Sequence, residues 1–267
     1  MDLGELRLLD EIAAAATVAP IEADLDGWWC KAAPDLPFRR CNVAMPPPDA
    51  AHDRARFLAE LDAVRAWYHG HGLRLIVQVS TALDGWEDVD AWLADTGLAV
   101  EAPVDLMVAG PEPTCDHCAA EAIRNVTVTD GIDVDWARTF GRIHGDDDRQ
   151  RDRAEAYGRM LSALGDRALG ASRAIDGQVA GIGLGVLDRG WLGIFGMGTA
   201  PQHRRQGIAT DVVWALRARA AERGIERAYL QVEVDNAPAI DLYQDVGFER
   251  SHGYHYRSEG EDPTLGC

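Results

Sequence analysis

Several features that would assign this chain to other protein classes are missing from its sequence. No apolar run approaches the roughly 20 residues that a membrane-spanning helix needs. The amino terminus, M-D-L-G-E-L-R-L-L-D-E, is acidic and has neither the basic segment nor the cleavage site of a secretory signal. We therefore expect a cytoplasmic protein that has no membrane partner.

An excess of positive charge is also missing. The 267 residues include 26 Lys and Arg against 44 Asp and Glu, which gives a formal net charge of -18. Proteins that hold nucleic acid through its phosphates need a basic surface, so the charge excludes that class of partner. An acidic chain attracts cationic small molecules or basic peptides instead, although solubility alone also accounts for the acidity.

Cysteines are few. Five in a chain of this length do not form a disulfide framework. Cys115, His117 and Cys118 have a spacing that can hold zinc, but a complete site needs a second pair of ligands. Cys30 and Cys41 are the candidates for that pair, and they lack paired ligand spacing. We therefore favour a reduced linker sequence here and predict no metal.

Nearly half of the residues are apolar, and their periodicity predicts helices and strands throughout the chain. In the first half it predicts helices at 5–18, 51–69 and 86–95, and strands at 27–30, 38–45, 73–79 and 98–107. Two prolines and the cysteine cluster at 109–120 indicate a linker. In the second half it predicts helices at 134–143, 150–164, from 208 to Gly224 and at 237–246, and strands at 123–129, three times between 168 and 199, at 227–234 and from Gly247.

The two halves repeat one order of elements. H-G-L-R-L-I-V-Q-V in the first half corresponds to R-G-I-E-R-A-Y-L-Q-V in the second, and W-L-A-D-T-G-L corresponds to L-Y-Q-D-V-G-F. A helix, glycine and strand in succession are common in any α/β protein. The shared Q-V ending and D-x-G turn nevertheless favour two copies of one α+β unit.

The stretch from Gly196 to Thr210, G-M-G-T-A-P-Q-H-R-R-Q-G-I-A-T, is typical of an anion-binding turn. A strand leads into a helix here, so free backbone N–H groups and the positive end of the helix dipole converge. Gly207 allows an anion to approach the backbone closely, while Arg204 and Arg205 add charged donors. Taken alone, the same turn also fits an ordinary solvated basic surface.

Residues 123–257 resemble the GNAT superfamily of acyl-CoA-dependent N-acetyltransferases. The family signature is Arg or Gln, two residues, Gly, one residue, then Gly or Ala, and it matches the run from Arg204 to Ala209. Ala200 and Pro201 precede the turn, Asn236 follows the next strand, and L-Y-Q-D-V-G-F comes at family spacing. The resemblance implies an α+β fold of two GNAT-like units, each a mixed, mostly antiparallel sheet flanked by helices.

The first half resembles the degenerate amino-terminal copy of tandem GNAT proteins, an arrangement also found in mycothiol synthase. Pro46, Pro47 and Pro48 stand where the anion turn should be, and proline has no N–H to donate. Leu93 stands where the second copy has Tyr243. We therefore expect one competent cofactor site, with a degenerate domain at 1–112, a linker at 113–120 and a catalytic domain at 121–267.

The resemblance implies an N-acetyltransferase that moves an acetyl group from acetyl-CoA to a primary amine by direct attack in a ternary complex. Acetyl-CoA, a cosubstrate, would lie in a gap between the fourth and fifth strands of the GNAT unit. Its pantetheine would follow the fourth strand, and a backbone N–H of that strand would meet the oxyanion. The implied cofactor-binding residues are Met197, Gly198, Thr199, Arg204, Arg205, Gln206, Gly207, Ile208, Ala209, Thr210, Asn236 and Tyr243.

Tyr243 is the predicted general acid, because an unperturbed tyrosine is protonated at neutral pH and can donate to a leaving thiolate. Core packing is the alternative role. Some relatives carry Glu at the position of Gln231, which cannot accept a proton, so Glu233 on the same side of the strand is the candidate base. A solvated carboxylate fits Glu233 equally well. His144, beside the aspartates at 146–148, is a second candidate base.

Several alternatives stay open at this point. A non-catalytic acyl-CoA-binding module with a protein-docking first half is the alternative function. The acceptor amine is unidentified, with mycothiol-pathway amines, aminoglycoside-like cations and peptide amino termini all compatible with the sequence, and a cationic acceptor favoured if the three aspartates contact it. The oligomeric state is left open between monomer and dimer.

Overall fold

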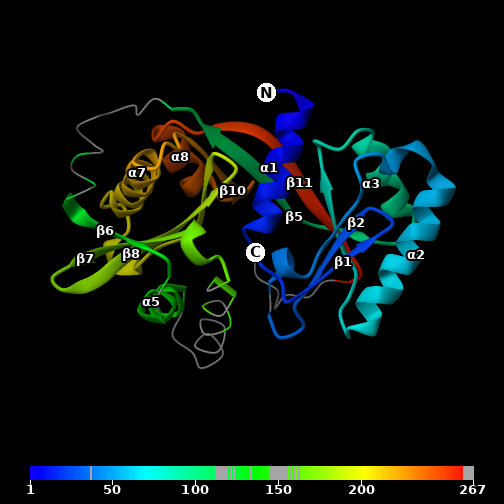
Figure 1. Ribbon diagram of the computed structural model, residues 1–267, viewed down its shortest axis with the longest axis horizontal. Helices are drawn as coiled ribbons and strands as arrows, with labels where there is room; N and C mark the ends of the chain where they lie inside the picture. The colour runs from blue at the N-terminus through cyan, green and yellow to red at the C-terminus, as the bar shows by residue number, and fades with distance from the viewer. Residues whose placement is uncertain are drawn as a thin grey trace. The chain divides into compact units, whose positions relative to one another are not determined.

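The fold is a computed structural model that describes residues 1–36, 38–111, 120, 122, 124–132, 134–144, 156, 158, 160, 161 and 163–260. The chain divides into two compact units (Figure 1). The first consists of Met1–Leu106 together with Ser251–Cys267, and the second of Met107–Arg250. None of the helices in the described ranges is both long and apolar enough to span a membrane.

In the first unit, the strands follow the order β1-β2-β3-β4-β11. β1 (Ile21–Leu25) is antiparallel to β2 (Trp28–Ala32), and β2 is antiparallel to β3 (Ala44–Met45). β3 is parallel to β4 (Ile76–Ser80), and β11 (Glu249–Ser258) is antiparallel to β4. The helices are α1 (Leu3–Ala15), α2 (Arg54–Gly70) and α3 (Trp86–Asp95), with single 3-10 turns at Arg39–Cys41 and Ala50–His52. The apolar stripe of α2 packs against β4 and α3 to form the core.

In the second unit, the strands follow the order β10-β9-β8-β7-β6. These are β6 (Val126–Asp130), β7 (Ala168–Ile175), β8 (Gln178–Asp188), β9 (Trp191–Thr199) and β10 (Arg227–Glu233). Only β9 and β10 pair in parallel, so the sheet is mixed and mostly antiparallel as predicted. The helices with described bounds are α5 (Val134–His144), α7 (Ile208–Ala221) and α8 (Ala237–Asp245), and 3-10 turns lie at Gly165–Arg167 and Pro201–His203. Figure 1 shows α7 and α5 on opposite sides of this sheet.

The turns of the two units repeat as the sequence predicts. Gly72 and Gly224 follow α2 and α7 with φ of 71° and 74°, and Gly97 and Gly247 follow α3 and α8 with φ of 86° and 87°. After each glycine, the next residue donates its N–H to the carbonyl five residues back, at 2.9 to 3.3 Å. This is the Schellman arrangement, in which a left-handed glycine ends a helix. The match supports a duplication of one structural unit.

The closing strand belongs to a different unit from the one that the sequence suggests. The sequence predicts a catalytic domain that continues to residue 267, whereas Ser251 onward falls in the first unit, where Tyr254 to Ser258 pair with β4. Conversely, β5 (Ala99–Ala109) ends in the second unit, whose core includes Met107 and Ala109. Alternation in a sequence predicts that a strand exists, but not which distant strand it pairs with.

Charged contacts fix this closing strand within the first unit. Asp90 accepts hydrogen bonds from His255 at 2.5 Å and from Nε and Nη2 of the Arg257 guanidinium, each at 2.7 Å. These contacts outweigh the desolvation of Asp90 and lower the pKa of its carboxyl group, the Arg257 hydrogen bond being the largest cause.

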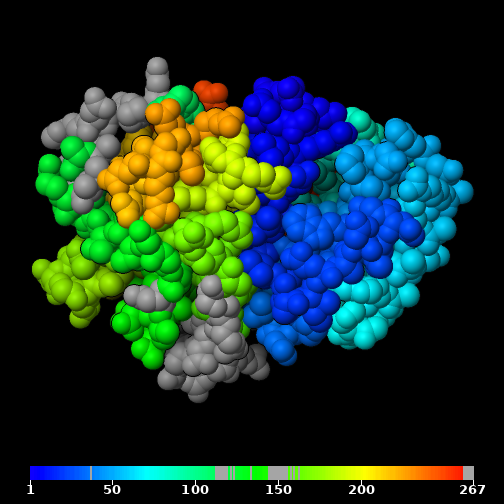
Figure 2. Space-filling view, viewed as in Figure 1, coloured from blue at the N-terminus to red at the C-terminus, as the bar shows by residue number. Residues whose placement is uncertain are grey.

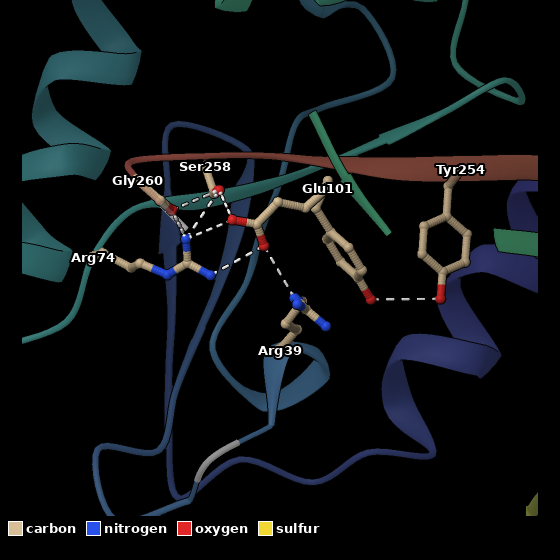
Figure 3. A network of polar contacts seen from close by, with 7 residues as sticks. Arg39, Arg74, Glu101, Tyr254, Ser258 and Gly260 are labelled. Carbon is tan, nitrogen blue, oxygen red and sulfur yellow. Dashed lines mark hydrogen bonds and ion pairs between the residues drawn. The ribbon is translucent and has the colours of Figure 1, made fainter. Parts of the chain in front are cut away.

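A second network lies around Glu101, whose side chain is only 8% exposed. Figure 3 shows Arg74, Arg39 and Ser258 converging on its carboxylate, at 2.5 to 3.1 Å. Burial by itself would raise the pKa of Glu101, but the hydrogen bonds from Arg74, Ser258 and Arg39 outweigh it and the pKa is lowered. Because Ser258 ends β11, this network anchors the last strand to the sheet of the first unit.

Candidate active site

The position of α7 depends on three glycines of β8. A Cβ atom at Gly181 or Gly183 would lie 2.2 or 2.6 Å from an α7 side chain, closer than real Cβ atoms approach, and one at Gly185 would lie 3.1 Å away, which is tighter than most Cβ contacts. The contacts join Gly181 to Ile208, Gly183 to Val212, and Gly185 to Leu216. Every second residue of β8 therefore contacts every fourth residue of α7, and the helix packs directly on the strand backbone. The packing fixes where the first turn of α7 lies. The sequence carries a signal for this packing in the alternation G-I-G-L-G of residues 181–185, which apolar periodicity alone does not reveal.

The sheet of the second unit opens between β9 and β10. Their parallel ladder runs from Trp191 and Arg227 to Ile194 and Leu230, and no further pairing between these two strands follows in the described ranges. On the other edge of β9, Gly183 of β8 stands opposite two residues, Gly196 and Met197. This is a β-bulge, and Gly196 has a φ of 54°. A bulge bends its strand and increases the local twist. The pairing of β9 with β10 ends at Ile194 and Leu230, and we call the unpaired stretch of the two strands beyond these residues the wedge.

A turn with open backbone donors follows β9. After Pro201–His203, Arg205 and Gly207 both have positive φ, 61° and 75°, and Gly207 caps α7 without any side-chain hydrogen bond. The N–H groups of residues 205–210 have no acceptor among the residues that the structure describes. Residues 204–207 are exposed, and Figure 2 shows yellow atoms of this part of the chain, near residue 200 on its colour bar, at the surface. Converging free N–H groups, a helix N-terminus and two arginines suit a phosphate group.

The corresponding helix of the first unit is closed to an anion. Asp53 caps α2, and its carboxylate accepts hydrogen bonds from the N–H groups of Ala55 at 2.9 Å and Arg56 at 3.1 Å. A negative charge of the chain itself therefore occupies the place that a phosphate would take. This contact, together with the prolines at 46–48, supports the prediction that the first unit has no working cofactor turn.

Tyr243 lies inside the second unit on the α7 side of the sheet. It is 9% exposed, belongs to the same hydrophobic cluster as Leu230 and Val232, and its ring centroid is 6.1 Å from that of Phe248. Its hydroxyl has no hydrogen-bond partner in the described part of the chain. Burial raises the pKa of Tyr243 to about 12, so the phenol stays protonated across the physiological range. Both predicted roles, packing and proton donation, are compatible with this position.

The opposite face of β10 carries a different group of side chains. Tyr229, Gln231 and Glu233 alternate with the core residues and point away from α7. The ring of Tyr229 lies 5.9 Å from that of Phe195 and 6.4 Å from that of Trp191, and Glu233 is half-buried at the end of the strand. The side-chain oxygen of Gln231 is buried without a hydrogen-bond partner in the described ranges. The sequence predicts only that Gln231 cannot act as a base, and it gives no sign of this unpartnered oxygen.

The remaining predicted site residues occupy three kinds of position. Gly198 and Thr199 pair with β8 and turn their other edge toward the wedge, whereas Met197 packs against the core beside Gly183. Asn236 caps α8, accepting a hydrogen bond from the N–H of Ala239 at 3.3 Å. The backbone of His144 ends α5, and nothing is described of its side chain; the aspartates at 146–148 lie outside the described residues.

The cysteines give no metal site within the described part of the chain, where no group of three metal-ligating side chains occurs. Cys30 and Cys41 are buried in separate hydrophobic clusters of the first unit. Burial raises the pKa of the Cys30 thiol to about 12 and that of Cys41 to about 11, which opposes the thiolate form that zinc binds. Cys115, His117 and Cys118 lie outside the described residues.

Comparison with known proteins gives a family match within the second unit and structural matches over most of the chain. Residues 133–248 match the acetyltransferase (GNAT) family. An N-alpha-acetyltransferase of Sulfurisphaera tokodaii is 41% identical over 66 residues, which are 24% of this chain and only 40% of that protein. Among solved structures, a GCN5-related N-acetyltransferase from Kribbella flavida has a TM-score of 0.67 at 15% identity, covering 94% of this chain and 95% of the other. A tandem GNAT protein from the clavulanic acid biosynthesis pathway has a TM-score of 0.62 at 15% identity, with 82% and 76% covered.

Proposed function

Since the chain belongs to the GNAT superfamily of acetyltransferases through residues 133–248, we propose that its second unit transfers an acetyl group from acetyl-CoA to a primary amine. One observation carries the proposal: the wedge between β9 and β10 lies on the strand that leads into the open N–H groups of residues 205–210. A ligand with a pyrophosphate at one end and a narrow arm that hydrogen-bonds a strand edge suits this combination.

The two ends of acetyl-CoA would have separate partners. The pyrophosphate would accept hydrogen bonds from the free N–H groups of the turn and would be attracted by the positive charges of Arg204 and Arg205. The pantetheine arm would run along the free edge of Gly198 and Thr199 into the wedge. The thioester would then lie near the last paired residues, Ile194 and Leu230, with Tyr243 on the α7 side of the sheet.

The reaction needs no enzyme nucleophile. The amine nitrogen attacks the thioester carbonyl, the C–N bond forms, and the C–S bond breaks after a tetrahedral intermediate whose oxyanion accepts a backbone N–H of β9. Tyr243 donates its proton to the departing thiolate and regains one from solvent. The proton lost by the amine passes to water or to Glu233. The acceptor is an amine small molecule or peptide, with a cationic one favoured by the charge of -18.

Acetylation of a broad panel of amines, followed by release of the CoA thiol, tests the proposal. Tyr243→Phe should lower kcat about 100-fold, the lower end of the usual effect of a general acid, and leave the Kd of acetyl-CoA nearly unchanged. Tyr254→Phe is the matched control, because it removes a buried phenol from the first unit, and it should keep full activity.

Two results would contradict the proposal. Equal turnover of wild type and Tyr243→Phe removes the role of Tyr243 as general acid. Tight binding of acetyl-CoA with no transfer to any amine would instead support a non-catalytic acyl-CoA-binding module.

A further inference from the structure

We infer that Gln231 binds the acceptor: its side-chain oxygen accepts a hydrogen bond from one N–H of the attacking amine and so selects primary amines over N-methylated ones. The inference rests on the proposed acetyl transfer and adds to it the residue that orients the nucleophile. It starts from the buried Gln231 oxygen that has no partner within the described residues.

A buried acceptor left without a donor costs a protein about 1–3 kcal/mol. A buried group of this kind needs an explanation, and a ligand that supplies the missing donor is one. Gln231 is the first residue of β10 after the last paired one, Leu230, so its side chain stands at the point where the wedge begins. This is also the place where the proposed path of the pantetheine arm ends.

The two faces of the sheet separate the attacking group from the leaving group. Leu230 and Val232 point into the cluster that contains α7 and Tyr243, whereas Gln231 points to the opposite face. An amine bound by Gln231 therefore approaches the thioester from one face, while the thiolate leaves toward the Tyr243 phenol on the other. This separation lets attack and departure proceed without the two groups competing for one space.

An amide oxygen can accept a hydrogen bond but cannot take a proton at neutral pH. The amine must therefore arrive uncharged, and bond formation leaves two hydrogens on the nitrogen of a primary amine. One hydrogen stays bound to the Gln231 oxygen and remains in the amide product, while the other is lost to water or Glu233. An N-methyl amine keeps only one hydrogen after attack, which must leave, so the Gln231 oxygen would lose its donor.

The test compares kcat/KM for the best primary amine of the panel and for its N-methyl derivative. Wild type should prefer the primary amine by about 10-fold or more, since one hydrogen bond in a buried site discriminates at this level. Gln231→Met, which has a similar size and no strong acceptor, should bring the ratio close to that of the uncatalysed reactions. The KM for acetyl-CoA should not change in this variant.

Gln231→Glu is the matched variant, because it keeps an acceptor oxygen at the same place. It should retain the preference for the primary amine and extend activity to lower pH, since a carboxylate can also take the proton. If Gln231→Met does not fold, this pH shift carries the test, and an unchanged pH profile overturns the inference.

Other outcomes are equally decisive. Equal losses on both amines in Gln231→Met, with the ratio preserved, would mean that Gln231 has a structural role only. Wild-type protein that acetylates no amine would overturn the proposed function and this inference with it, whereas active wild type with an unchanged ratio in Gln231→Met would overturn the inference alone.

Discussion

Replacing Gly207 by Asp should place a carboxylate beside the N–H groups of the anion-binding turn. Asp53 places one at the corresponding helix of the first unit from an extended backbone with φ of -146°, whereas the backbone of Gly207 is left-handed. Gly207 caps α7 with no side-chain hydrogen bond, and a Cβ atom added there meets nothing within 4 Å. Its φ of 75° is one that Asp and Asn adopt more readily than most residues. The carboxylate of Gly207→Asp would then compete with the CoA pyrophosphate for the N–H groups of α7.

The magnitude follows from what Asp53 does in α2, where it takes two N–H groups. Two lost hydrogen bonds to phosphate amount to about 1–3 kcal/mol, and repulsion between the carboxylate and a phosphate about 4 Å away adds about 1 kcal/mol in water. The sum is about 2–4 kcal/mol, which corresponds to an increase of about 30- to 1,000-fold in the Kd of acetyl-CoA. Gly207→Asn takes the N–H groups without the charge and should cost about 5-fold less than Asp.

Isothermal titration with CoA and acetyl-CoA at two salt concentrations measures these effects. Gly224 is the matched control site, because it ends the same helix with a φ of 74° and also has no neighbour within 4 Å of an added Cβ. Gly224→Asp should leave the Kd of acetyl-CoA within about twofold of wild type. The difference in Kd between Gly207→Asp and Gly207→Asn should become smaller at high salt, because salt screens the added charge. Equal affinities for Gly207→Asp and Gly224→Asp would refute the assignment of the turn.

Two further predictions concern packing and pH. Gly181→Ala should destabilise the second unit by about 1–3 kcal/mol and weaken acetyl-CoA binding, because its Cβ would lie 2.2 Å from Ile208 Cγ2. Ile208→Ala should lower the free energy of unfolding less in the Gly181→Ala background than in wild type, and simple additivity of the urea midpoints would contradict the contact. The folded-state pKa of Tyr243, about 12, lies above its unfolded value of about 10, so its stabilising contribution is complete below pH 10 and is lost as pH rises toward 12. The free energy of unfolding of wild type should therefore fall by about 1 kcal/mol more than that of Tyr243→Phe between pH 9 and pH 11. Equal losses in urea titrations of the two proteins would show that the phenol is not desolvated.

Local patterns predicted many of the elements from the sequence. The helix expected at 86–95 is α3, and the helix expected at 237–246 with Asn236 as its cap is α8, because caps, prolines and glycines mark those ends directly. β1 was missed. Its sequence, I-E-A-D-L, is a short hairpin strand with two acidic residues, which local propensity does not favour. The strand expected at 38–45 is mostly the turn Arg39–Cys41 followed by the two residues of β3.

The candidate site divides in the same way between local and distant causes. The open turn at residues 204–210 follows from neighbouring residues in the chain, so a motif predicts it. The wedge depends on a bulge opposite Gly183, and the unpartnered Gln231 oxygen depends on what packs around β10. The pairing of β11 with β4 joins residues about 175 positions apart in the chain, as in the contact between Tyr254 and Ser80. No property of a short sequence window encodes such pairs.

The duplication explains why one unit carries the chemistry and the other does not. Both units keep the features that stability requires, namely an apolar helix stripe, a left-handed glycine after each helix and a buried strand between them. They differ at the residue that caps the corresponding helices. Asp53 accepts hydrogen bonds from two N–H groups of α2 and stabilises it, whereas the first N–H groups of α7, behind Gly207, have no acceptor among the residues that the structure describes. A carboxylate cap stabilises its helix by only a few tenths of a kcal/mol relative to glycine, and it fills the place of the anion, so stability and cofactor binding compete at this one position.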